Sequence, residues 1–340
     1  MGGHVKRVAR SHSGPQMTRR EFTLCLAGVA MARARPKGQT PPRPAIKVQS
    51  LNHVAFRASD VQRTADWYQT FFGMPVQFRQ DVPGGRVALL RVGPGPEFIA
   101  LYPANGAKPG FKHMGFGVSN FDRASIDQAL TAHNVKAEWS VRSAEGGDVE
   151  ELVIRDPDNL VIQIQDARYS GGGGRLGDAW ARPWTLPPRG PRPTLAMRCI
   201  NHVTFGSSSK ERAENFYRDL FGLPMLSWDY RPAEPSRILG VAAGSPRHFI
   251  APGQGRAIGV SHYCLGIEGF DRERITQALK EQGITPQPSG DRVGCCGSKV
   301  VYNGSETIFG LRDPDGFSVQ LTDADYCAGT GPLGTVCMPG

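Results

Sequence analysis

This 340-residue chain lacks the sequence features of several protein classes. No segment approaches 18 consecutive apolar residues, so we expect no membrane-spanning helix. It has no basic run and no aromatic-basic face, and five of its nine net positive charges fall within residues 1–34, so we expect no nucleic-acid partner. None of its seven cysteines forms a Cys-x-x-Cys pair. The hydrophobic share of 39% suffices for two domains with cores of their own.

The first 34 residues are typical of an export signal. The letters TRREF at positions 18–22 precede an apolar stretch at 22–32 and the small-x-small segment ARA at 32–34. Because eleven apolar residues cannot span a hydrocarbon core of about 30 Å, this is not a membrane anchor. It resembles a twin-arginine leader, with a disordered basic tail as the alternative, so we expect a periplasmic or secreted protein. In an oxidising compartment some cysteines should pair, and we favour Cys327 with Cys337.

One motif occurs twice. The letters NHVAF at 52–56 return as NHVTF at 201–205, an offset of 149, and His113 returns at the same offset as His262. Each of these histidines lies 60 residues after the first histidine of its half. Turns that begin Asp-Pro-Asp at 156 and 313 repeat at an offset of 157, so eight residues are inserted in the second half, near Cys295. A repeat of this length indicates duplicated domains, not a solenoid.

Composition divides the chain into six segments. Proline is dense after the leader, and residues 170–198 hold four consecutive glycines and five prolines, which is typical of a linker. We predict a signal peptide at 1–34, a Pro-rich spacer at 35–48, a first domain at 49–168, a Gly/Pro-rich linker at 169–198, a second domain at 199–324 and a Cys/Gly-rich tail at 325–340.

Each half predicts the same elements twice. A strand at 51–56 or 200–205 leads into a helix that ends at Gly73 or Gly222, and in the second helix apolar residues at 213, 216, 217, 220 and 221 follow a period of 3.6. Further strands are expected at 87–92, 97–101, 113–118 and 262–267, helices at 124–130 and 274–279, and a hairpin of 151–155 and 161–165 across the Asp-Pro turn. The predicted order is βαβββ four times, an α+β fold.

These motifs resemble the vicinal oxygen chelate superfamily, which includes glyoxalase I, extradiol ring-cleaving dioxygenases and the fosfomycin and bleomycin resistance proteins. The matching letters are Asn-His-Val-x-Phe, then WY or FY before Phe-Gly-(Met/Leu)-Pro, then HMGF or HYCL, then Arg-Asp-Pro-Asp, in this order twice. The resemblance implies tandem half-barrel mixed sheets with helices outside. It also implies a divalent metal on the concave side, with Fe²⁺ or Mn²⁺ expected and Ni²⁺ or Zn²⁺ as alternatives.

The resemblance carries the ligand positions onto two sets of residues. The first half offers His53, His113 and Gln163, with Ala100 at a fourth position; the second offers His202, His262 and Gln320, with Ala251. Strand parity agrees, because alternate side chains share a face of a pleated strand. Each histidine therefore shares its face with small residues, and bulky neighbours such as Val54, Phe56, Met114 and Phe116 lie on the opposite face.

The predicted ligand set departs from the usual one. Two imidazoles and a carboxylate leave open positions for substrate and dioxygen in non-haem iron oxygenases. Here glutamine takes the carboxylate position in both halves, so a bound metal would keep its full charge and favour anionic chelating substrates. The tyrosine that ring-cleaving enzymes keep before the Asp-Pro turn is replaced by Gly310. His248 is a candidate acid-base residue, and Tyr263 and Tyr302 are candidate proton donors, each with a structural role as its alternative.

Two functions follow from these residues. The first is an exported metal-dependent dioxygenase, isomerase or lyase that acts on a small oxygenated, chelating substrate, with the second half active because only it has His248 and the inserted loop. The alternative is a metal-free periplasmic protein that binds or sequesters a small molecule through the same polar residues. For the four repeated histidines, metal ligation, direct ligand binding and a relic of an ancestral site all stay open.

Overall fold

The computed structural model describes residues 45–177, 195–228, 236–241, 248–255, 257–281, 283, 309–328 and 333. The elements of the first half are β1 (Val48–Ala58), α1 (Val61–Phe72), β2 (Val76–Val82), β3 (Gly85–Arg91), β4 (Phe98–Pro103), β5 (Gly110–Val118), α2 (Arg123–Ala132), β6 (Glu138–Arg142), β7 (Val149–Arg155) and β8 (Val161–Asp166). Those of the second half are β9 (Met197–Ser207), α3 (Lys210–Phe221), β10 (Met225–Trp228), β11 (Ser236–Gly240), β12 (Phe249–Gln254), β13 (Gly259–Ile267), α4 (Arg272–Glu281), β14 (Phe309–Arg312) and β15 (Ser318–Asp323).

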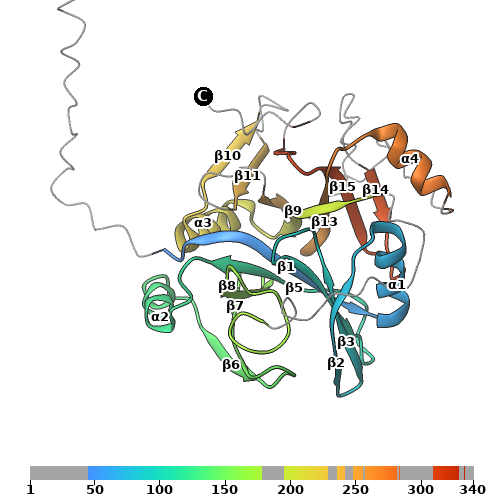
Figure 1. Ribbon diagram of the computed structural model, residues 1–340. Helices are drawn as coiled ribbons and strands as arrows, with labels where there is room; N and C mark the ends of the chain where they lie inside the picture. The colour runs from blue at the N-terminus through green and yellow to red at the C-terminus, as the bar shows by residue number, and fades with distance from the viewer. Residues whose placement is uncertain are drawn as a thin grey trace, which may run out of the picture. The chain divides into compact units, whose positions relative to one another are not determined.

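Two mixed sheets carry these strands (Figure 1). The first has the order β2-β3-β4-β1-β5-β8-β7-β6 and the second the order β10-β11-β12-β9-β13-β15-β14. In both, the strand that bears the first histidine lies in the middle, parallel to one neighbour and antiparallel to the other. The predicted α+β fold of repeated βαβββ modules is confirmed; in the last module the described residues supply β13, α4, β14 and β15.

The helices begin and end where local chemistry favours it. The Asp60 side chain accepts a hydrogen bond from the Arg63 amide at the start of α1, and Ser209 does the same for Arg212 at the start of α3. Gly73 and Gly222 follow these helices with φ of 60° and 65°, a left-handed conformation that glycine adopts without strain. Both predicted helix ends are confirmed.

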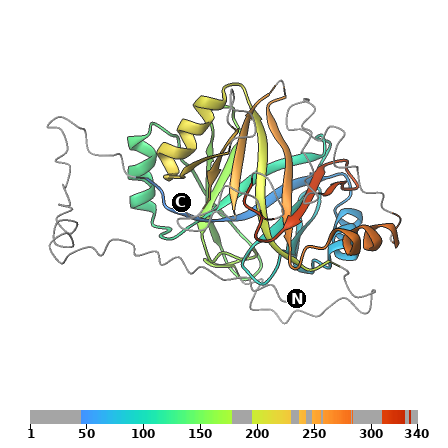
Figure 2. The same ribbon diagram turned by 90° about the horizontal axis from the view of Figure 1, so that it is seen from above.

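One hydrophobic core joins the two sheets. The bulky residues predicted to face away from the histidines, among them Val54, Phe56, Met114 and Phe205, all belong to it. It also holds rings from opposite halves in contact, such as Phe56 with Tyr263 at 5.1 Å between centroids. Two views show α1 beside α4 and α2 beside α3, so each of these two pairs combines one helix from the first half with one from the second (Figure 1, Figure 2). The halves therefore form one unit through shared apolar surface.

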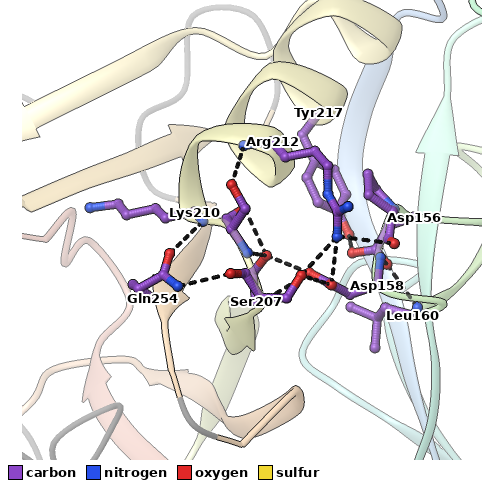
Figure 3. Close-up of polar contacts among 11 residues, drawn as sticks. Asp156, Asp158, Leu160, Ser207, Lys210, Arg212, Tyr217 and Gln254 are labelled. Atoms are coloured by element: carbon purple, nitrogen blue, oxygen red, sulfur yellow. Dashed lines mark hydrogen bonds and ion pairs between the residues drawn. The ribbon is translucent and has the colours of Figure 1, made fainter.

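The two Asp-Pro turns fasten the halves reciprocally. Asp158 of the first half accepts hydrogen bonds from the Ser207 and Ser208 hydroxyls (Figure 3). It also forms an ion pair with Arg212, at the start of α3, with 3.0 Å between nitrogen and oxygen. Asp315 of the second half makes the matching contacts with the start of α1. The first aspartate of each turn forms the turn itself, as Asp156 does by accepting from two backbone amides at 2.8 and 2.9 Å.

Several predictions fall outside the described residues: the leader at 1–34, most of the spacer, Tyr302, Cys295, Cys296 and Cys337. Cys327 takes part in a disulfide, and Cys199 and Cys264 are buried free thiols. Within the described part of the chain, no helix is both long and apolar enough to cross a membrane.

Candidate metal and ligand sites

The first predicted set of residues meets on the concave face of the first sheet. The Nε2 atom of His53 lies 3.1 Å from Nε2 of His113 and 3.2 Å from Oε1 of Gln163. All three side chains are buried. They come from β1, β5 and β8, and the β5–β8 pairing that puts Gly115 opposite Gln163 brings the glutamine level with the imidazoles. The structure therefore unites three residues separated by up to 110 positions in the chain.

The second set meets in the same way on the second sheet. The rings of His202 and His262 lie 5.5 Å apart between centroids at 85°, compared with 5.1 Å and 87° for His53 and His113. Gln320 hydrogen-bonds to His202, as Gln163 does to His53. Both arrangements are the convergence that strand parity predicts.

Residues that the sequence analysis did not assign orient the first histidine of each set. The Oδ1 atom of Asn52 lies 2.9 Å from Nδ1 of His53, and the Asn52 amide nitrogen donates to the Tyr169 carbonyl at 2.8 Å. In the second half, Oδ1 of Asn201 lies 2.8 Å from Nδ1 of His202, and the Asn201 amide nitrogen donates to the Tyr326 carbonyl at 2.7 Å. The only available signal was the asparagine that precedes histidine in both copies of the motif.

An aromatic ring on the neighbouring strand supports each of these imidazoles. Phe98 stacks on His53 with centroids 4.6 Å apart, and Phe249 stacks on His202 at 4.4 Å. The parallel pairing of β4 with β1 and of β12 with β9 sets each phenylalanine opposite its histidine. Together the asparagine and the phenylalanine fix both the position and the rotation of the ring.

The second histidine of each set has a different partner in each half. Nδ1 of His113 lies 3.5 Å from the Lys112 ammonium nitrogen, which in turn sits 4.3 Å from the centre of the Tyr102 ring. Nδ1 of His262 lies 3.2 Å from the Ser261 hydroxyl, which donates to the Thr204 carbonyl at 3.1 Å. A cation at one position and a hydroxyl at the other give the two sites different electrostatics.

The first donor set has the spacing of ligands on a divalent metal. Its separations of 3.1 and 3.2 Å are those of neighbouring ligands on one ion with bonds of about 2.1 Å, and the second set has a similar ring arrangement, with centroids 5.5 Å apart. Among the described residues, no three His, Cys, Asp or Glu side chains come together, so the third protein donor would be the neutral amide oxygen of Gln163 or Gln320. Imidazole and carbonyl donors suit iron, manganese, nickel or zinc.

Burial keeps the histidines neutral at physiological pH. It lowers the pKa of His262 to about 4 and that of His53 to about 3; for His53, hydrogen bonding to Gln163 opposes the shift and the charge of Lys112 adds to it. The pKa values of His113 and His202 are also lowered, first by burial and then by the neighbouring imidazole. A neutral imidazole can ligate a metal or accept a proton without first losing one.

A cavity of about 290 Å³ opens beside the first set. One wall is apolar and includes Phe78, Leu89 and Phe98, whereas His53, Gln163, Tyr102, Tyr169, Glu151 and Arg142 supply polar groups. Arg142 is held by Glu151 at 2.6 Å and by the Tyr169 hydroxyl at 3.0 Å. The sequence analysis did not single out Arg142, Glu151, Tyr102 or Tyr169, because no local motif connects these four residues.

The candidate acid-base residues have separate positions. Tyr263 is fully buried in the core between the sheets, where its hydroxyl bonds to that of Tyr68. It therefore lies on the opposite face of β13 from His262 and is not placed to donate a proton at the site. Nδ1 of His248 lies 2.9 Å from the Ile200 carbonyl, which anchors this ring to the backbone of β9. Its role in proton transfer stays a prediction.

Comparisons with known proteins agree with this architecture. Residues 50–164 match the model of the Glyoxalase/Bleomycin resistance protein/Dioxygenase superfamily. A probable chloroplastic lactoylglutathione lyase of Arabidopsis thaliana is 26% identical over 292 residues, which cover 81% of this chain and 73% of that protein. Metapyrocatechase 2 of Cupriavidus necator is 23% identical over 317 residues, covering 87% of this chain and 88% of that protein.

A solved structure resembles the whole described architecture. Homoprotocatechuate 2,3-dioxygenase of Brevibacterium fuscum, in complex with 3,4-dihydroxyphenylacetate, superposes with a TM-score of 0.59 at 14% identity. The superposition covers 88% of this chain and 87% of that one, so it shows that both sheets share the fold. The family match places residues 50–164 in the Glyoxalase/Bleomycin resistance protein/Dioxygenase superfamily, and the second half repeats the same modules and the same paired histidine site.

Proposed function

We propose that this protein is a divalent-metal-dependent enzyme of the dioxygenase, isomerase or lyase type, with the metal held by His202, His262 and Gln320. The observation that carries the proposal is the set of hydrogen bonds at the outer nitrogens of the two imidazoles. A ligating histidine usually donates its other N–H to an oxygen, which fixes the tautomer and the ring orientation. Both histidines of the second half have such an oxygen.

The hydrogen-bond donors in this half can be assigned one by one. The Asn201 amide nitrogen is used by the Tyr326 carbonyl, so its oxygen faces His202 and must accept the Nδ1 proton. The single hydroxyl proton of Ser261 goes to the Thr204 carbonyl, so the Ser261 oxygen accepts from Nδ1 of His262. Nε2 of each imidazole therefore carries a lone pair, as metal ligation requires.

The histidines of this set are neutral donors. The pKa of His262 is lowered by burial, and that of His202 by burial and by its neighbouring imidazole. Neutral donors leave the +2 charge uncompensated, so we infer that the substrate is a small oxygenated anion with two adjacent oxygens, such as a catecholate, an enolate or a hydroxy acid. When bound, the metal would supply a Lewis acid that polarises a C–O or C–H bond of this substrate.

The chain's own residues would position and deprotonate the substrate. Phe249 and Asn201 hold the His202 ring, and Ser261 holds that of His262. We further propose that His248, whose Nδ1 lies 2.9 Å from the Ile200 carbonyl, accepts the proton of a substrate hydroxyl. We also propose export by the twin-arginine route, which the leader motif supports.

Elemental analysis of untagged protein, reconstituted with iron, manganese, nickel and zinc in turn, tests the proposal. We expect a stoichiometric divalent metal, lost from the His262→Ala variant and kept by the His113→Ala variant, which removes the equivalent histidine of the other half. Less than about 0.2 metal per chain after reconstitution would refute a metalloenzyme. Equal losses from both variants would show that the metal does not belong to the second half alone.

A further inference from the structure

In the first half, a continuous chain of hydrogen bonds gives every ring nitrogen of His53 and His113 a partner within the protein. The Lys112 ammonium has no lone pair, so it can only donate, and Nδ1 of His113 must accept. The proton of His113 then lies on Nε2 and points to Nε2 of His53, 3.1 Å away. The direction of each later bond follows from this one.

His53 continues the chain. Its own proton lies on Nδ1, because the Asn52 oxygen opposite it must accept while the Asn52 amide nitrogen donates to the Tyr169 carbonyl. Nε2 of His53 is thus an acceptor toward His113, and Oε1 of Gln163 lies 3.2 Å from the same nitrogen. By this assignment the space between the two Nε2 atoms holds the proton of His113.

Lys112 is the residue that makes the first site chemically different from the second. The position equivalent to it is Ser261, which accepts from the imidazole instead of donating to it. Lys112 also brings a positive charge: together with Arg142 it opposes protonation of His53, and together with Arg57 that of His113, each after the larger effect of burial. Because like charges repel in a region of low dielectric constant, the first half disfavours a bare dication and favours an anion.

The adjoining cavity has the shape and chemistry of a site for an amphipathic anion. Arg142 is fixed by bonds from Nε and Nη2 to Glu151, Tyr169 and the Gly172 carbonyl, and its Nη1 makes no hydrogen bond with any described residue. The Tyr102 hydroxyl, on the same wall, has a pKa raised to about 12 by burial, so it remains a donor. The opposite wall is hydrocarbon and aromatic, and a volume of about 290 Å³ suits a ligand of one ring or a short chain.

We propose that the first-half cavity is a second ligand site that binds a small organic carboxylate without a metal, through Arg142 and the Tyr102 hydroxyl, beside His53. The duplicated domains then have different tasks, with metal chemistry in the second half and recognition of an organic anion in the first. The apolar wall formed by Phe78, Leu89 and Phe98 distinguishes such a carboxylate from inorganic phosphate. This site is separate from the metal site proposed above and does not depend on it.

Isothermal titration calorimetry on the full chain, stripped with a chelator and checked by elemental analysis, tests the binding. The probes are benzoate and hexanoate, with benzamide as the uncharged match for benzoate and inorganic phosphate as the anion without hydrocarbon. We expect a carboxylate to bind, benzamide and phosphate to bind at least tenfold more weakly, and Arg142→Gln to weaken the carboxylate by about tenfold or more. Arg218→Gln, on the exposed side of α3, should bind as the unaltered protein does.

Failure to bind either carboxylate, equal binding of benzamide, or unchanged binding by Arg142→Gln would overturn the proposal. A chain that binds carboxylate but holds no metal would refute the proposed enzyme and leave this site standing. A chain that holds two metals in its unaltered form would refute this site and leave the enzyme standing. The two proposals therefore fail in distinguishable ways.

Replacing Lys112 tests the tautomer argument by a readout other than activity. Lys112→Ser copies the second-half arrangement onto the first, so Nδ1 of His113 can donate and Nε2 can ligate. We expect bound metal to rise from about one to about two per chain, and carboxylate affinity to fall. If the serine variant folds poorly, Lys112→Met serves instead, because it keeps an aliphatic stem against Tyr102. It should also raise bound metal and lower carboxylate affinity. No gain of metal in either variant would contradict the assigned role of Lys112.

Discussion

Replacing Asn201 by alanine should weaken metal binding without touching a ligand. The side chain is fully buried and fixes His202 through a contact of 2.8 Å to Nδ1. Loss of such an outer partner typically costs 10- to 100-fold in metal affinity, or about 1.4 to 2.7 kcal/mol. Because Asn201 also donates to the Tyr326 carbonyl at 2.7 Å, the variant should lose about 2 kcal/mol of unfolding free energy as well.

Two companion variants separate these effects. Asn201→Asp keeps an acceptor for Nδ1 but loses the donor to Tyr326, so it should lose stability and retain most of the metal affinity. Asn52→Ala makes the equivalent change in the first half and should lower stability with no change in metal affinity. Affinity would be measured by competition with a chromophoric chelator, and stability by urea unfolding of the chelated protein. If Asn201→Ala binds metal as tightly as the unaltered chain, the assigned His202 tautomer is wrong.

Further predictions concern the interface, the first site and pH. Asp158→Ala removes a carboxylate that binds Ser208 and Arg212 of the other half, so it should lower the free energy of unfolding by about 1 to 2 kcal/mol; an unchanged urea midpoint would contradict its fastening role. A Cβ at Gly115 would lie 2.1 Å from Cε1 of His53, so Gly115→Ala should displace this ring and weaken carboxylate binding while leaving bound metal constant, as calorimetry and elemental analysis would show. Burial lowers the pKa of His262 to about 4, so the unfolded chain takes up a proton that the folded chain excludes, and stability should fall as pH drops from 6.5 toward 4; a flat urea midpoint across that window would count against it. Burial raises the pKa of Glu97 to about 8, so its protonated carboxyl favours folding at low pH and stability should decline as pH rises from 4.5 to 8, a slope that Glu97→Gln should remove from the same titration.

Sequence periodicity predicted the helix ends and the buried faces correctly because these depend on local chemistry. Gly73 and Gly222 adopt the left-handed conformation that the end of a helix requires, and the alternation of histidine with small residues gave the correct concave face. Tyr263 was assigned as a possible donor on residue type alone. Its position in the core follows from the same parity, because it is adjacent to His262 and faces the other way.

The sequence by itself determined the duplication, the βαβββ order and the two sets of histidine and glutamine, because each is a pattern of spacing along one chain. Only the tertiary structure decided what lies next to these sets. Arg142 comes from β6 at the edge of the first sheet. Lys112 and its counterpart Ser261 each lie beside Nδ1 of a histidine, where lysine can only donate a hydrogen bond and serine accepts one. Proton position and charge depend on distances of a few ångströms between strands remote in sequence, and no linear pattern specifies these distances.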